Sequence, residues 1–237
     1  MTAYTGLMRL LATSLFALSV AASPRLAAAG ACRPSTITAA PLAAEAAIAP
    51  DGGALIGWDD VAAADAPPLD KLDAWKFTAG TATVGTTRTV LAPGLVRFAP
   101  DAPATGALGL ADDGGTLRVA VTPAATVPAP LAAPRASVRT RTFNRGRYGV
   151  GAETTARLVR IPDLAVAVVM YPAGEDVATG WARVGSAKTI SLVATPGRCR
   201  QSPDGMLIPE PGTRVQLAWV DRLGRLSPRS KPIRVGR

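Results

Sequence analysis

The sequence predicts an all-β protein made of two tandem β-sandwiches, and three observations support this prediction. Proline (21 residues) and glycine (23 residues) are abundant in the 237-residue chain, which disfavours long helices. Short runs alternate apolar and polar residues with a period of two, as strands with one buried face do. Roughly seven such runs, separated by turn residues, fall within about 85 residues of the N-terminal half, which is the spacing of a sandwich.

Residues 1–29 have the features of a signal peptide. Arg9 supplies a short positive segment, and residues 10–22 form an apolar run. Ala27-Ala28-Ala29 supplies the small residues that signal peptidase requires, and Ala22 is an earlier alternative. The apolar run, about 13 residues long, is too short to cross a bilayer. We therefore expect an exported protein, periplasmic or extracellular, with no transmembrane segment after cleavage.

Residues 33–122 are expected to form the first sandwich. Asp112-Asp113-Gly114-Gly115 is a strong hairpin signal between its last two strands. Residues 59–73 are predicted to be a loop, because Pro67-Pro68 excludes a regular helix. The predicted strands are Ala44–Ile48, Ala54–Trp58, Trp75–Thr78, Gly85–Leu91, Leu95–Phe98, Gly106–Ala111 and Thr116–Val121.

Residues 123–134 are rich in proline and alanine, which is typical of a semi-rigid linker. Residues 135–237 are expected to form the second, basic sandwich. Its most apolar run, Leu164–Tyr171, is predicted to be a buried strand. Other predicted strands before the final hairpin are Arg135–Thr142, Thr154–Ile161, Gly180–Val184 and Thr189–Ala194.

The final hairpin begins with a strand in which Val215, Leu217 and Trp219 share one face, predicted to be buried. Asp221-Arg222-Leu223-Gly224 supplies a turn, and a second run ends at Val235. This pattern resembles the last two strands of immunoglobulin-like and fibronectin-III-like domains, in which a strand ending in Val-Asp leads to a glycine turn and a Ser/Pro-rich return. The resemblance, to bacterial secreted proteins of this kind, implies two tandem sandwiches of this type and no particular ligand.

Cys32 and Cys199 are the two cysteines of the chain. In an oxidising compartment an even number of cysteines predicts a disulfide bond. Because a disulfide requires Cα atoms within about 7 Å, this bond needs domains packed side by side, or an N-terminal segment that returns along the second domain. The alternatives are lipidation of Cys32, since Ala29-Gly30-Ala31 partly resembles a lipobox, or two free thiols.

The net charge differs between the two halves of the chain. Residues 33–130 contain six basic and ten acidic residues, a net charge of −4, whereas residues 131–237 contain eighteen basic and seven acidic residues, a net charge of +11. Such asymmetry predicts either mutual attraction of the two domains or a basic domain that meets an anionic partner.

Five arginines in the second domain occupy odd-numbered positions, so that in an extended segment all five project from the same face. Guanidinium groups bind phosphate, sulfate or carboxylate bidentately, which makes this row a candidate anion-binding site. The alternative is a solvated edge strand whose charges block edge-to-edge pairing. The row consists of Arg135, Arg139, Arg141, Arg145 and Arg147.

No set of residues with the pattern of a catalytic or metal site is present. The chain has no histidine, which excludes a Ser-His-Asp triad and a histidine-ligated zinc ion. Two cysteines cannot build a four-thiolate site. We therefore expect a protein without enzymatic activity, cofactor or metal.

The function expected from the sequence is that of an exported structural or adhesive module of the envelope or the extracellular space. The alternative is a module that binds anionic glycans or other polyanions through the arginine row. The expected partners are an anionic polysaccharide or another envelope protein. Salt dependence distinguishes the two functions, because polyanion binding weakens as salt is added.

Overall fold

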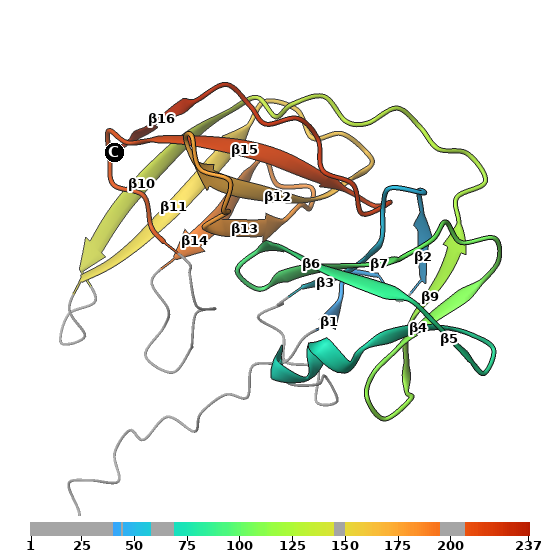
Figure 1. Ribbon diagram of the computed structural model, residues 1–237. Helices are drawn as coiled ribbons and strands as arrows, with labels where there is room; N and C mark the ends of the chain where they lie inside the picture. The colour runs from blue at the N-terminus through green and yellow to red at the C-terminus, as the bar shows by residue number, and fades with distance from the viewer. Residues whose placement is uncertain (1–39, 44, 58–68, 145–149, 195–206) are drawn as a thin grey trace, which may run out of the picture. The chain divides into compact units, whose positions relative to one another are not determined.

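The computed structural model describes residues 40–43, 45–57, 69–144, 150–194 and 207–237, and these residues are almost entirely β (Figure 1). The predicted leader, Cys32, Cys199, Arg145 and Arg147 lie outside the described residues. The signal peptide, the disulfide bond and the lipidation of Cys32 therefore stay predictions. No helix in the described ranges is long and apolar enough to span a membrane.

The N-terminal half contains two sheets. One has the order β1-β3-β7-β6 and the other the order β2-β9-β8-β4-β5. All pairs are antiparallel except β2–β9, which is parallel. The strands are β1 (Ala40–Pro41), β2 (Glu45–Ile48), β3 (Ala54–Gly57), β4 (Lys76–Ala79), β5 (Ala82–Val84), β6 (Thr86–Ala92), β7 (Leu95–Pro100), β8 (Leu108–Ala111) and β9 (Leu117–Pro123).

Side chains from both of these sheets form one apolar core. Ile56 and Phe98 come from one sheet, and Phe77 comes from the other; all three are buried. Trp75 stacks on Phe98 with ring centroids 5.9 Å apart. The predicted loop over residues 59–73 is wrong at its end, because Leu69–Ala74 form the 3-10 helix η1. This helix buries Leu72 in the same core, which explains why a short helical turn forms there.

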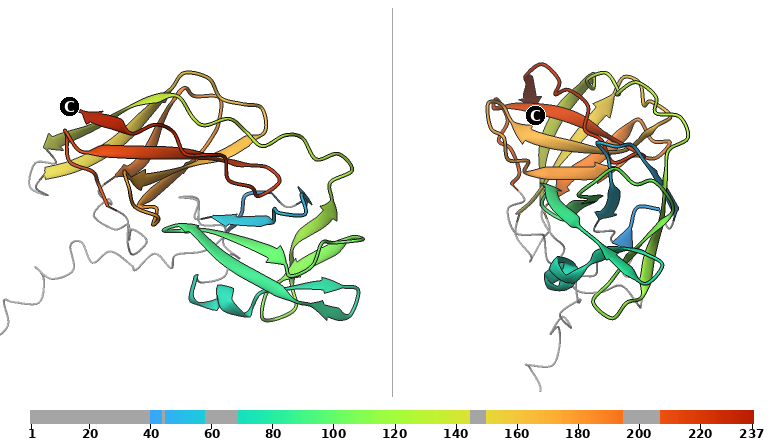
Figure 2. Two further views of the ribbon diagram at one scale, coloured as in Figure 1. Left: turned by 45° about the horizontal axis from the view of Figure 1, so that its top comes forward. Right: turned by 45° about the vertical axis from the view of Figure 1, so that its right-hand side comes forward.

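The C-terminal half has the strand order β13-β12-β15-β16-β10-β11-β14. The final strand, β16, joins the group β13-β12-β15 to the group β10-β11-β14. It pairs antiparallel with β15 and parallel with β10. Figure 2 shows β10 and β11 running side by side as a long ribbon. The strands are β10 (Ala136–Asn144), β11 (Val150–Leu158), β12 (Ala165–Pro172), β13 (Gly180–Arg183), β14 (Thr189–Ala194), β15 (Arg214–Asp221) and β16 (Ile233–Gly236).

The predicted inward face of β15 is confirmed. Val215, Leu217 and Trp219 are each at most 1% exposed, and they pack in one core with Val138 of β10 and Met170 of β12. The Ser/Pro-rich segment that follows the turn is bound to β15 through a serine side chain. The hydroxyl of Ser227 accepts a hydrogen bond from Trp219 N at 2.9 Å, where a regular strand would offer a carbonyl oxygen.

A third apolar core connects the two halves. The alternate residues of β12 and β15 face away from the C-terminal core, and Val169 and Val220 are nonetheless fully buried. They pack with Leu55 and Leu95 of the N-terminal half and with Trp181 of β13. β12 is therefore buried on both faces, which explains the unbroken apolar run of its sequence. The halves meet through this apolar surface, and burial of nonpolar side chains stabilises the contact.

The turn after β15 also binds the N-terminal half. Leu223 O accepts a hydrogen bond from Gly53 N at 3.0 Å, and Gly224 O accepts one from Arg97 Nη1 at 3.3 Å. Gly224 has a φ of +80°, and a Cβ there would lie 2.1 Å from Gly53 O. Glycine is required at this position for both reasons, since a side chain would be strained and would also separate the halves.

Candidate anion-binding face

The arginines of β10 lie on its solvent-exposed face. Arg139 and Arg141 are exposed, as is Arg135 immediately before the strand, whereas Val138 and Thr140 between them are buried. The alternation of the sequence thus describes β10 correctly as far as Asn144. Beyond that residue the row continues outside the described chain.

The alternative of an edge strand is wrong for the part of β10 around Val138 and Arg139. This strand pairs with β11 along its whole length, and Val138 and Arg139 also pair with β16 on the other side. Because β10 has neighbours on both sides there, its arginines are not needed to block edge-to-edge pairing. Protection of an edge therefore does not explain Arg139, which lies between two paired strands.

Among the described members of the row, Arg141 is the one whose charge is matched. Its Nη2 donates a hydrogen bond to Oε2 of Glu153 at 2.8 Å. Glu153 lies directly opposite Arg141 on β11. The hydrogen bond from Arg141 lowers the pKa of Glu153, partial burial opposes this effect, and a hydrogen bond from Ser191 adds to it. Glu153 is therefore ionised at neutral pH and neutralises Arg141.

Two further arginines of this face come from the neighbouring strands β11 and β16. Arg157 of β11 lies directly opposite Ser137 of β10. Arg234 of β16 is exposed and precedes Val235, which pairs with Val138. Reasoning from the sequence missed both residues, although Arg157 alternates with the buried Ala156 and Leu158. Their proximity to β10 depends on strand pairing, which no local pattern reveals.

The arginine face is defined here as the exposed side of β10, β11 and β16 that carries Arg135, Arg139, Arg157 and Arg234. Among the described residues, no acidic side chain forms an ion pair with these four guanidinium groups. Arg214 of β15, also exposed, lies directly opposite Arg234. Without a matching acid, the free protein holds an unneutralised positive surface. Like charges directly opposite each other in a sheet also destabilise it.

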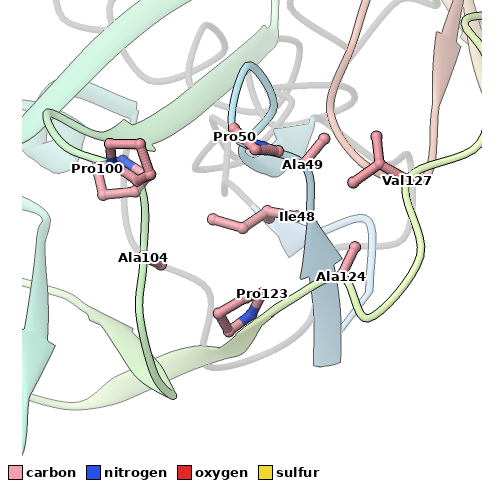
Figure 3. Close-up of a pocket in the computed structure, with 9 residues that line it drawn as sticks. Ile48, Ala49, Pro50, Pro100, Ala104, Pro123, Ala124 and Val127 are labelled. Atoms are coloured by element: carbon pink, nitrogen blue, oxygen red, sulfur yellow. The ribbon is translucent and has the colours of Figure 1, made fainter.

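Two hollows differ in their relation to this face. A small cavity of about 80 Å³ between Ile48, Pro100, Pro123 and Val127 is lined only by aliphatic residues and proline (Figure 3). None of the side chains that line it is polar or charged. A larger open groove of about 640 Å³ adjoins the arginine face, with Arg135 and Lys231 in its lining. Apart from Arg135, Lys231 and Ser230, the side chains that line the second hollow are apolar.

The adjacent carboxylates Asp112 and Asp113 belong to a hairpin, as predicted. Asp112 Oδ1 accepts hydrogen bonds from Gly114 N at 3.0 Å and from Thr116 N at 2.8 Å, and its Oδ2 pairs with Arg118. Desolvation of Asp112 acts to raise its pKa, but these hydrogen bonds and the charge of Arg118 outweigh it and lower the pKa. The arrangement is that of a turn.

The chain matches no protein-family model, no curated protein and no solved structure.

Proposed function

We propose that this protein is an exported, non-enzymatic module that binds polyanions, such as an anionic polysaccharide, through its arginine face. The observation that carries the proposal is the set of exposed arginines on three paired strands whose charges no described acid neutralises. A surface of this kind attracts polyanions and holds their anionic groups through charge-assisted hydrogen bonds.

The architecture supports the proposal in two ways. The three strands belong to one sheet, so the backbones of the arginines are held in fixed register and need not be ordered on binding. The C-terminal half also carries most of the positive charge of the chain. Tandem immunoglobulin-like or fibronectin-III-like sandwiches are part of the proposal. The competing function is a structural or adhesive module, for which no polyanion binding is expected.

The double variant Arg139→Gln/Arg157→Gln tests the proposal. With a labelled DNA duplex as the probe polyanion, the slope of log K against log salt should fall by about one per lost contact, since each contact releases a condensed counterion. The melting temperature should change little, because exposed substitutions alter stability by within about 0.5 kcal/mol.

Arg222→Gln is the matched control, because Arg222 is exposed in the turn after β15 and lies away from β10 and β11 in the pairing. Its salt slope should stay close to that of the wild type. Equal slopes for the double variant and the wild type, or wild-type protein that does not bind the duplex at any salt, would contradict the proposal and favour a purely structural module.

A second prediction concerns the acid on this face. Glu153→Gln should strengthen polyanion binding, because Gln removes the charge that neutralises Arg141. The slope of log K against log salt should become steeper by about the amount of one additional contact. The measurement is the same titration, carried out at pH 7, where the lowered pKa keeps wild-type Glu153 ionised. Unchanged or weaker binding would show that Arg141 lies outside the contact surface.

A further inference from the structure

Ser137 lies at the centre of the arginine face. Arg135 and Arg139 are two residues away on either side along β10, a spacing of about 7 Å. Arg157 lies directly opposite Ser137 on β11, at roughly 5 Å between Cα atoms. The parallel register of β10 and β16, continued by one residue, places Arg234 on the other side. Ser137 itself is exposed, so its hydroxyl opens to solvent among four arginines.

We propose that these five residues, here called the Ser137 site, bind one phosphate or sulfate group. The Ser137 hydroxyl donates a hydrogen bond to one oxygen of the anion, and the surrounding guanidinium groups donate to the others. This inference rests on the proposed function and narrows it: the polyanion is one that carries phosphate or sulfate groups, such as a sulfated or phosphorylated glycan.

The number of donors around Ser137 favours a tetrahedral anion over a carboxylate. A carboxylate has two oxygens, which one arginine can satisfy bidentately. On this surface a single arginine engages a carboxylate, because Nε and Nη2 of Arg141 both donate to Oε2 of Glu153, at 3.2 and 2.8 Å. A phosphate or sulfate group offers three or more oxygens, so it can accept from several guanidinium groups at once.

The electrostatics of the free protein point to the same ligand. Four positive charges surround Ser137, and no described acid pairs with any of them. Their mutual repulsion is relieved when an anion binds, and a ligand that binds only the folded state also stabilises that state. A bound dianion should therefore raise the melting temperature more than monovalent salt does.

The substitution Ser137→Asp tests the geometry directly, because it places a carboxylate among the four arginines. We expect a higher melting temperature for Ser137→Asp in dilute NaCl, and loss of the further rise that sodium sulfate or sodium phosphate causes in the wild type at equal ionic strength. Ser137→Asn is the neutral control, and it should melt no higher than the wild type in NaCl. Arg157→Gln should weaken sulfate binding by about tenfold, because one charge-assisted contact is lost.

Two polymers separate this inference from the proposed function. Wild-type protein should retain dextran sulfate to a higher salt concentration than polyglutamate, and Ser137→Asp should remove that difference. Equal retention of the two polymers by the wild type would overturn the Ser137 site while leaving polyanion binding intact. So would an equal loss of sulfate binding in Arg157→Gln and in the control Arg222→Gln. If neither polymer is retained, the proposed function fails, and this inference fails with it.

Discussion

Replacement of Asp221 by alanine is expected to lower the free energy of unfolding by about 3–5 kcal/mol, measured by urea denaturation. Asp221 and Arg225 are both buried, and Asp221 Oδ2 accepts from Arg225 Nε at 2.9 Å. Asp221 Oδ1 also accepts from the backbone N–H groups of Leu223 at 3.0 Å and Arg225 at 2.9 Å. Alanine leaves a buried guanidinium group without its counter-charge and two N–H groups without an acceptor, which explains the size of the loss.

The substitution should also loosen the contact between the halves. Arg225 Nη1 donates to Pro128 O in the segment between β9 and β10 at 3.0 Å, and the same turn accepts hydrogen bonds from Gly53 and Arg97. A turn that has lost Asp221 no longer holds these partners in position. The effect therefore exceeds that of an isolated ion pair.

Asp112→Ala is the matched control for this prediction. Asp112 also accepts two backbone hydrogen bonds in a glycine turn and pairs with an arginine, but its hairpin lies within the N-terminal half alone. We expect a loss of about 1–2 kcal/mol there. Equal losses at Asp112 and Asp221 would mean that the contacts of the 221–225 turn with the N-terminal half add no stability.

Replacement of Trp219 by alanine is expected to lower the free energy of unfolding by about 3–5 kcal/mol, as large-to-small substitutions in cores do. Trp219 is 1% exposed and packs in the C-terminal core. Removal of its indole leaves a cavity that the neighbouring strands can fill only in part, because they are held by paired hydrogen bonds. The midpoint of urea denaturation is the appropriate measurement.

Two substitutions calibrate this result. Trp219→Phe keeps an aromatic ring and should lose clearly less stability than Trp219→Ala. Leu226→Ala removes a side chain that is 37% exposed in the same hairpin, so it should change the free energy of unfolding by about 0.5 kcal/mol. A loss below about 1 kcal/mol for Trp219→Ala would show that the C-terminal core relaxes around the missing indole.

Most strands could be predicted because their signals are local. Leu164–Tyr171 was predicted as a buried strand, and β12 covers Ala165–Pro172. The hairpin at Asp112 follows from its turn residues in the same way. β5 was missed because Ala82–Val84 has only three residues, too few to show a period. The 3-10 helix was missed because the burial of Leu72 depends on a core assembled from distant strands.

The candidate site could be predicted only in part. The odd-numbered positions of Arg135, Arg139 and Arg141 were enough to place them on one exposed face. Arg157 and Arg234 could not be assigned to that face, because strand pairing depends on contacts between residues far apart in the chain. The register also decides that Arg141 is matched by Glu153 and that Ser137 lies between unmatched arginines.

The sequence by itself determined the all-β class, the inward face of β15 and the outward face of β10, because alternation along a strand is a property of the local chain. The tertiary structure alone decided that Val169 and Val220 are buried between the halves, since a second buried face exists only when another sheet covers it. It also decided that β10 has a paired strand on each side at Val138 and Arg139. That choice depends on β16, which follows β10 by almost ninety residues and reaches it only when the last strand completes the sheet.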